Sequence, residues 1–146
     1  MAGLTFKEIA SRTSGTRLEL SQFVKISYLK FGHSRKLGIP KAICQSYSQD
    51  KDSQGRVKKF KYTTMIEFYK DNKIKVSCSC ADHLYRWEMV LVKHKASYNT
   101  YSNGERPKTT NPTNQISTCK HVLALHRYLG LKGLLPKKAE LPDVSV

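Results

Sequence analysis

The sequence has 146 residues, of which 39% are hydrophobic and 25% charged, and its formal net charge is +15. This length fits a single domain, and no stretch reaches the ~18 consecutive apolar residues of a membrane-spanning helix. The first residues, MAGLTFKEIASR, lack the apolar core of a secretory signal. We therefore expect neither a membrane protein nor a secreted one.

The positive charge is spread along the whole chain and forms no basic tail. Such an excess attracts phosphate polymers, anionic lipids or acidic protein surfaces. It is equally compatible with a well-solvated surface that keeps the protein soluble. Composition alone leaves both interpretations open.

The N-terminal segment is predicted to contain a short helix. Thr5 and Glu8 have the spacing of a capping box, in which a hydroxyl and a carboxylate satisfy the free amides at a helix start. This predicts a helix over residues 6–12, which Ser14 and Gly15 then interrupt.

Two extended segments follow. Residues 22–31 alternate apolar and polar side chains with the period of a strand. A second run covers residues 39–47, where Pro40 restricts it to a sheet edge or to a strand start. Residues 50–55 are predicted to form a polar turn.

The centre of the chain predicts a hairpin followed by a helix. Residues 57–70 and 74–78 are rich in β-branched and aromatic side chains, and a short polar turn separates them. Asp82 is placed to cap a helix over residues 83–91. Helical spacing predicts that its core side chains are Leu84, Trp87, Val90 and Leu91.

The C-terminal third combines a long loop with one more helix. Residues 96–118 are rich in Ser, Asn, Thr, Gly and Pro, and Asn103–Gly104 could turn a small hairpin within them. An amphipathic helix is then predicted to begin at Cys119 and to end at Gly130, with Val122, Leu125 and Leu129 on its buried face. Residues 131–146 are predicted to form an extended tail.

Three cysteines and one histidine have the pattern of a structural zinc site. Cys78 and Cys80 end the predicted hairpin, and Cys119 and His121 begin the predicted helix. Zinc prefers four thiolate and imidazole ligands in a tetrahedron, and each close pair could present two of them. Closing the long loop between the pairs costs far less than the roughly 10–16 kcal/mol that zinc supplies in small peptides.

Other interpretations of these residues remain open. The even number of cysteines allows disulfides, although a reducing compartment and the Cys-x-Cys spacing favour a metal. The thiols could also be buried and free, with His121 on a helix surface. His83 and His126 could replace His121 as a ligand, whereas His33, His94 and Cys44 are expected to be ordinary core or surface residues.

The pattern Cys78-Ser79-Cys80 and Cys119-Lys120-His121 resembles the SWIM zinc finger. This resemblance covers residues 57–130 and implies a zinc-stapled ββα unit that contacts DNA or proteins. The gap of 38 residues between the two pairs is longer than is usual for that family. We expect an α+β fold with a small antiparallel sheet or hairpin, two helices and a long loop. The single domain, 1–146, would then comprise an N-terminal part, 1–56, the zinc-binding unit, 57–130, and a tail, 131–146.

A wider motif block is similar to small virion proteins of tailed bacteriophages. It runs from Cys78 to Leu125 and includes Tyr85, Trp87 and the Asn-Gly and Asn-Pro turns. The resemblance implies a minor structural component of the neck, tail or baseplate. The expected location is the virion, with the cytoplasm as the alternative.

Two binding functions are therefore predicted ahead of catalysis. The first is an assembly module that contacts neighbouring protein subunits. The second is a nucleic-acid-binding protein, whose Tyr or Trp rings would stack on bases and whose phosphate contacts would be Lys58, Lys59, Lys61, Lys120 and Arg127. An enzyme is disfavoured because the sequence has no phosphate-binding loop, no paired-carboxylate motif and no assigned partner for Cys44. No small-molecule substrate and no membrane partner are expected.

Overall fold

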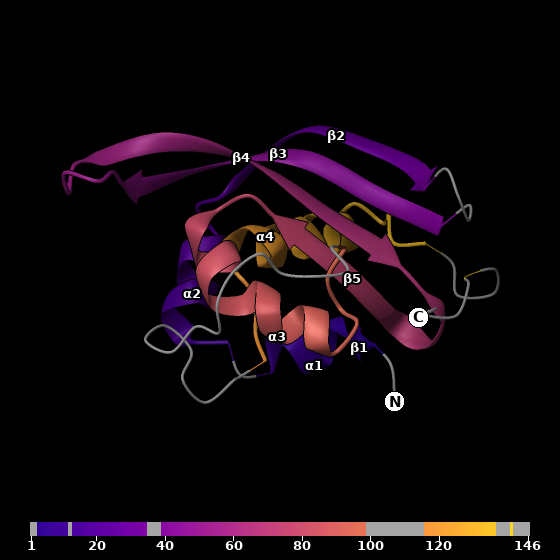
Figure 1. Cartoon of the computed structure of the whole chain (residues 1–146). Helices are drawn as coiled ribbons and strands as arrows, with labels where there is room; N and C mark the ends of the chain where they lie inside the picture. The colour runs from indigo at the N-terminus through magenta and orange to yellow at the C-terminus, as the bar shows by residue number, and fades with distance from the viewer. Residues whose placement is uncertain (1–2, 12, 35–38, 99–115, 137–140, 142–146) are drawn as a thin grey trace.

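The computed structural model describes residues 3–11, 13–34, 39–98, 116–136 and 141. These residues form one five-stranded antiparallel sheet in the order β1-β5-β4-β3-β2, with the helices gathered on one side of it (Figure 1). The predicted α+β class is confirmed, although the sheet is larger and the helices more numerous than expected. The elements are β1 (Leu4–Thr5), α1 (Phe6–Ala10), α2 (Gly15–Ser21), β2 (Lys25–Ser34), β3 (Ile39–Lys51), β4 (Val57–Phe68), η1 (Lys70–Asn72), β5 (Lys73–Cys78), η2 (His83–Trp87), α3 (Glu88–Lys93) and α4 (Lys120–Leu131).

The capping box predicted at the N-terminus is present. Glu8 N–H donates to Thr5 Oγ1 over 3.1 Å, and Thr5 N–H donates to Glu8 Oε1 over 3.0 Å. The first helix ends before Ser14 and Gly15, as predicted, but a second helix, α2, begins there and was not predicted. Ser14 caps it by accepting a hydrogen bond from Arg17 N–H. Serine and glycine favour helix starts as well as loops, and the sequence alone did not distinguish the two roles.

The strand β2 has the predicted length but begins three residues later than predicted, whereas β3 begins where it was predicted and extends four residues further. Pro40 is the second residue of β3 and pairs with His33, which agrees with the prediction of a strand start. β3 is nevertheless a central strand, since β2 lies on one side of it and β4 on the other. A β-bulge interrupts the β2–β3 pairing between Ser27 and Lys30.

The central hairpin forms as predicted. β4 and β5 pair antiparallel with Thr64 opposite Cys78, and the short η1 turn joins them. Asp71 and Asn72 have positive φ in this turn, a conformation that these two residue types adopt more readily than most. The hairpin places Cys78 at the last position of its second strand.

The helical segment after Cys80 is irregular. It contains a π-helical turn, η2, before it continues as α3. The prediction that Asp82 caps this helix through its side chain was wrong, since Asp82 already has helical backbone angles and its carboxylate bonds elsewhere. The π turn also shifts Leu84 out of the core, to 41% exposure, whereas Trp87, Val90 and Leu91 are buried as expected.

The helix α4 forms where it was predicted, but its end was misplaced. Gly130 lies inside the helix, which continues to Leu131. Gly133 has φ +66° and terminates it, with Leu134 N–H donating to the carbonyl of Leu129 and Gly133 N–H donating to that of Gly130. This pair of bonds is a Schellman cap, which requires the left-handed conformation that glycine adopts without strain.

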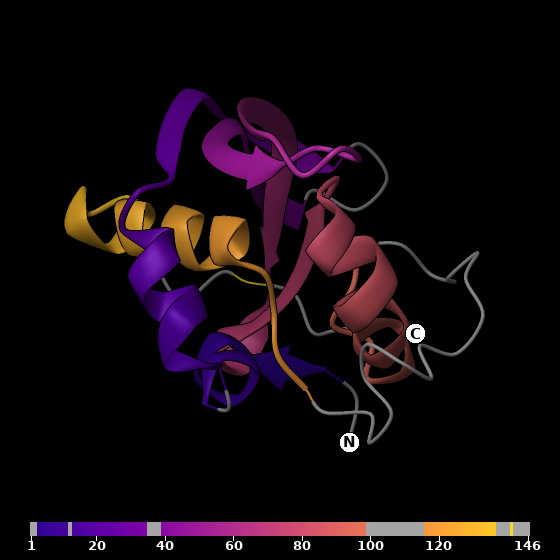
Figure 2. The ribbon, with the colours of Figure 1, turned by 90° about the vertical axis from the view of Figure 1, so that its left-hand side faces the viewer.

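The core lies between the sheet and the helices. α4 crosses the sheet with Val122, Leu125 and Leu129 fully buried against it, and α2 packs beside α4 (Figure 2). We call the helix-covered side of the sheet its inner face, which includes Ala42, Cys44 and Cys78. The opposite side, which no described helix covers, is its outer face (Figure 1).

Two sequence predictions fall on segments beyond these elements. The turn at Asn103–Gly104 lies outside the described residues, and so does most of the predicted tail. In the described part of the chain, no helix combines the length and the apolar character needed to cross a bilayer.

Candidate metal centre

The four predicted metal ligands meet at one point beneath the sheet. The thiol sulfurs of Cys78, Cys80 and Cys119 and a ring nitrogen of His121 all lie within 4.8 Å of one another, and all four residues are buried. In a tetrahedral site with metal–sulfur bonds of about 2.3 Å, the sulfurs lie about 3.8 Å apart. Small side-chain shifts would therefore allow one ion to contact all four. None of the cysteines forms a disulfide.

Each ligand is held at the end of a regular element. Cys78 ends β5, and Cys119 is the N-cap of α4, which places His121 in the first turn of that helix. Cys80 begins the other helical segment, where its sulfur accepts a hydrogen bond from His83 N–H at 3.4 Å. Two helices thus start at the cluster, and the positive ends of their dipoles favour the thiolate form of the cysteines.

A hydrogen-bonded relay orients the imidazole of His121. Ser48 Oγ donates to Asp50 Oδ2 over 2.8 Å, so the hydroxyl has no second hydrogen to give. It must therefore accept from His121 Nε2–H, which lies 2.7 Å away. The opposite nitrogen, Nδ1, is buried and makes no hydrogen bond within the described part of the chain. The relay leaves Nδ1 with a free lone pair, the state that a metal ligand needs.

The carboxylate at the end of the relay is ionised. Burial alone would raise the pKa of Asp50, but hydrogen bonds from Lys120 and Ser48 hold it below its ordinary value. Lys120 Nζ lies 2.5 Å from Asp50 Oδ1. An ionised Asp50 makes His121 a stronger donor to Ser48 and a more basic metal ligand.

The thiols have sharply different proton affinities in the absence of an ion. Hydrogen bonds donated by Cys119 and Cys80 lower the pKa of Cys78 well below its ordinary value. Burial raises the pKa of Cys119 well above it. Three adjacent sulfurs in an apolar core cannot all ionise without a cation, so the donor set fits a bound metal better than free thiols.

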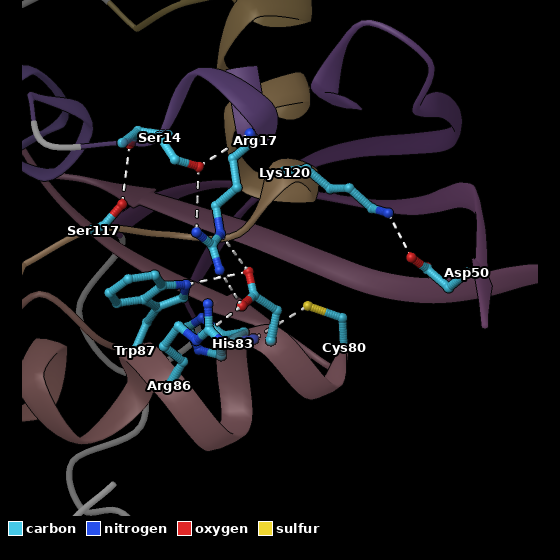
Figure 3. Close-up of polar contacts among 11 residues, drawn as sticks. Ser14, Arg17, Asp50, Cys80, His83, Arg86, Trp87, Ser117 and Lys120 are labelled. Carbon is cyan, nitrogen blue, oxygen red and sulfur yellow. Dashed lines mark hydrogen bonds and ion pairs between the residues drawn. The ribbon is translucent and has the colours of Figure 1, made fainter. Parts of the chain in front are cut away.

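A second polar network ties α2 to the helical segment after Cys80. The guanidinium of Arg17 donates to both carboxylate oxygens of Asp82, over 2.9 and 2.8 Å. Trp87 Nε1–H donates to the same carboxylate over 3.2 Å. Figure 3 shows Arg17 extending from α2 toward Trp87, with its guanidinium carbon 4.9 Å from the ring centroid. Arg17 is therefore a positioning residue beside the cluster, not a ligand.

The other candidate ligands lie outside the group. His83 is fully buried, and neither of its ring nitrogens has a partner among the described residues. Burial lowers its pKa, which keeps it neutral. His126 stacks on Phe6 with ring centroids 3.6 Å apart, and Cys44 contacts Ser46. His94 is exposed, and the side chain of His33 is not among those described.

The five residues predicted to contact phosphates do not share one surface. Lys59 and Lys61 are exposed on the outer face of β4. Lys58 pairs with Asp52 at 3.5 Å, and Lys120 bonds to Asp50. Arg127 donates to the hydroxyl and the carbonyl of Ser21, so it links α4 to α2.

Sequence reasoning missed the residues that support the ligands. Ser48 and Asp50 lie far from His121 in the chain, and their positions in an alternating strand carry no local signal of a metal site. Arg17 was missed because no helix or strand was predicted for the segment that contains it. Asp82 was singled out from the sequence, but as a helix cap and not as the partner of Arg17.

Removing the relay hydroxyl is expected to weaken metal binding. The substitution Ser48→Ala leaves His121 Nε2–H without its acceptor and should lower metal affinity by about 10- to 100-fold, as with other supporting residues at metal sites. Competition with a chromophoric chelator measures this affinity. Ser27→Ala, on the opposite face of the sheet, is the control and should leave it unchanged. Equal affinities for both variants would remove Ser48 from the site.

In comparisons with protein-family models, curated proteins and solved structures, the chain has no significant match. The compact group of ligands is compatible with a zinc finger. No family match supports the resemblance to SWIM fingers or to phage virion proteins, and both stay predictions.

Proposed function

We propose that this chain is a non-enzymatic binding module whose fold is stapled by one structural zinc ion. The observation that carries this proposal is the closed ligand group, in which Cys78, Cys80, Cys119 and His121 are all buried and close enough to share one ion. When bound, the ion supplies four coordination bonds that join the end of β5 to the starts of two helices.

The donor set favours zinc over the other common metals. Three thiolates and one imidazole form a Cys₃His set, which is typical of structural zinc sites. Calcium and magnesium prefer oxygen ligands, and none of the four donors is an oxygen.

The surroundings of the group offer little for catalysis. A catalytic zinc keeps one position open for water or substrate, whereas four protein ligands fill a tetrahedron. A hollow of about 460 Å³ lies beside the group, but its charged side chains are already paired. Asp50 bonds to Lys120, and Asp82 bonds to Arg17. These pairings support a role in binding, not a role in acid–base chemistry.

Cobalt substitution tests whether the site is closed. Elemental analysis of the purified protein should find one zinc per chain, and replacing it with Co²⁺ should give the visible spectrum of a tetrahedral ion with three sulfur ligands. Adding azide or cyanide should leave that spectrum unchanged. A spectral shift on addition would reveal an open position and contradict the proposal.

The nature of the partner is a separate part of the proposal. We place the module in a larger assembly with other protein subunits. The narrower prediction, a virion component of a tailed bacteriophage, depends on the motif block alone. Co-sedimentation of the protein with intact phage particles would support this narrower prediction, and its absence from them would contradict it.

A further inference from the structure

The outer face of the sheet is strongly basic. Strand register places Lys25 of β2, Tyr47 of β3 and Lys61 of β4 in one row across three neighbouring strands. Lys59 lies in the adjacent row of β4, and Lys30 lies further along β2. All four lysines are exposed. Alternation of side chains in the strands directs these residues away from the helices.

Acidic side chains do not offset this charge. The strands β2 to β5 contain only two acidic residues, Asp50 and Glu67. Asp50 lies on the inner face, bonded to Lys120 of α4. Glu67 is on the outer face but is buried at the far end of β4, where it accepts a hydrogen bond from the Tyr69 hydroxyl.

Tyr47 lies in the middle of the basic row. It is half-buried, its hydroxyl donates to Gln45 Oε1, and Lys59 Nζ lies 5.2 Å from its ring centroid. A cation over a ring that solvent partly reaches is weakly held, so a phosphate could draw Lys59 away and free the ring for stacking. The row thus combines an aromatic surface with cations on both sides of it.

A second aromatic side chain is displayed in a strained conformation. Tyr28 lies at the β-bulge of β2 with φ +51° and is 73% exposed. A bulky residue with positive φ is costly, and such outliers often mark functional positions. The ring borders a shallow hollow of about 290 Å³, which is lined by Tyr28, Lys30, Ile43, Cys44, Gln45 and Thr63.

We propose that the outer face of β2, β3 and β4 binds single-stranded nucleic acid. Tyr28 and Tyr47 stack on bases, and Lys25, Lys30, Lys59 and Lys61 contact phosphates. This inference names a partner for the proposed binding module and rests on that proposal. The helices that the metal would staple pack on the inner face of the sheet and so support the strands that carry the binding surface.

The chemistry of the face favours a single strand over other polyanions. Stacking needs bases whose faces are open, which a duplex does not offer along its length. An acidic protein would satisfy the lysines but would give no reason for a strained, exposed tyrosine at the bulge.

Fluorescence anisotropy with the zinc-loaded full chain tests the proposal. The probes are labelled 15-nucleotide oligothymidylate and oligouridylate, a DNA duplex of the same length, and polyglutamate as the acidic polypeptide. One or both single strands should bind more tightly than the duplex and polyglutamate at the same salt concentration. The comparison of the two single strands shows whether DNA or RNA is preferred.

Charge-matched variants locate the binding surface. Lys25→Ala/Lys61→Ala should weaken binding at least tenfold and reduce the slope of log affinity against log salt by about 1.4, since each single-strand phosphate contact contributes about 0.7. The control Lys7→Ala/Lys93→Ala removes the same charge from exposed positions of α1 and α3 and should have much less effect. Equal losses in both doubles would show non-specific attraction and overturn the proposal.

Substituting Tyr28 separates a role in binding from a role in stability. Asparagine tolerates positive φ better than tyrosine does, so Tyr28→Asn should keep or raise the melting temperature. It should nevertheless weaken single-strand binding about tenfold through lost stacking. If binding is unchanged, Tyr28 is not part of the site, and the proposal fails.

The remaining outcomes separate this inference from the proposed function. Zinc content and the cobalt spectrum are measured on the same preparations. A chain that holds its zinc but binds the duplex or polyglutamate as tightly as the single strands overturns the nucleic-acid proposal and leaves the staple intact. If the purified chain contains no zinc, the proposal of a structural zinc ion is overturned, whether or not the chain binds the oligonucleotides.

Discussion

Replacing Cys119 with serine is expected to release the metal and unfold the region around α4. Cys119 is fully buried and provides both a ligand and the N-cap of the helix that carries His121. Serine is a poor zinc ligand, so the substitution removes binding energy that in zinc peptides is about 10–16 kcal/mol. That energy is comparable to the whole stability of an ordinary domain, which is about 5–15 kcal/mol. Elemental analysis, circular dichroism and thermal unfolding measure the effect, and chelation of the parent protein should reproduce it.

The structure offers a matched control for this substitution. Cys44 is also buried and free, but it lies outside the ligand group. Because its neighbour Ser46 could bond a hydroxyl in the same place, Cys44→Ser should keep one metal per chain and unfold close to the parent temperature. If Cys119→Ser unfolds like the parent, the site is not structural.

The ligand group was predictable because two short motifs lie next to strong secondary-structure signals. Cys78 and Cys80 follow a run of β-branched residues, and Cys119 and His121 open a clear helical period. The preference of zinc for four soft donors then pairs the two motifs despite the long gap between them. The hairpin and α4 were predicted for the same reason, since their periodicity is sustained over many residues.

The supporting residues could not be predicted, because their roles come from tertiary contacts. The sequence around Ser48 indicates only a strand with alternating side chains. Its hydrogen bond to His121 exists because α4 packs across β3. The basic outer face has the same origin. Lys25 and Lys61 are far apart in sequence, and the register through Tyr47 brings them into one row. The preference of Asp for helix N-caps also gave a wrong prediction for Asp82. Its carboxylate forms an ion pair with Arg17 instead of capping the helix.

Trp87→Ala is expected to destabilise the protein by about 3–5 kcal/mol, as for other buried tryptophan truncations. Trp87 is 5% exposed and belongs to the core cluster that also contains Cys80 and Leu91. The substitution leaves a cavity in this core cluster. It also removes a donor to Asp82 and the ring against which Arg17 lies. Urea unfolding of the metal-loaded protein measures the loss.

Two further variants separate the packing of Trp87 from its hydrogen bond. Trp87→Phe keeps an aromatic ring but removes the indole N–H, while Asp82 still accepts from Arg17. Its cost should therefore be smaller, close to the roughly 1.5–3 kcal/mol of one hydrogen bond to a charged group. Leu84→Ala, on the same helical segment but 41% exposed, should cost less than about 1 kcal/mol. A loss for Trp87→Ala no larger than that for Leu84→Ala would place the indole on a contact surface. In that case the ion pair between Arg17 and Asp82, and not the packing of the indole, would connect α2 to the helical segment that follows Cys80.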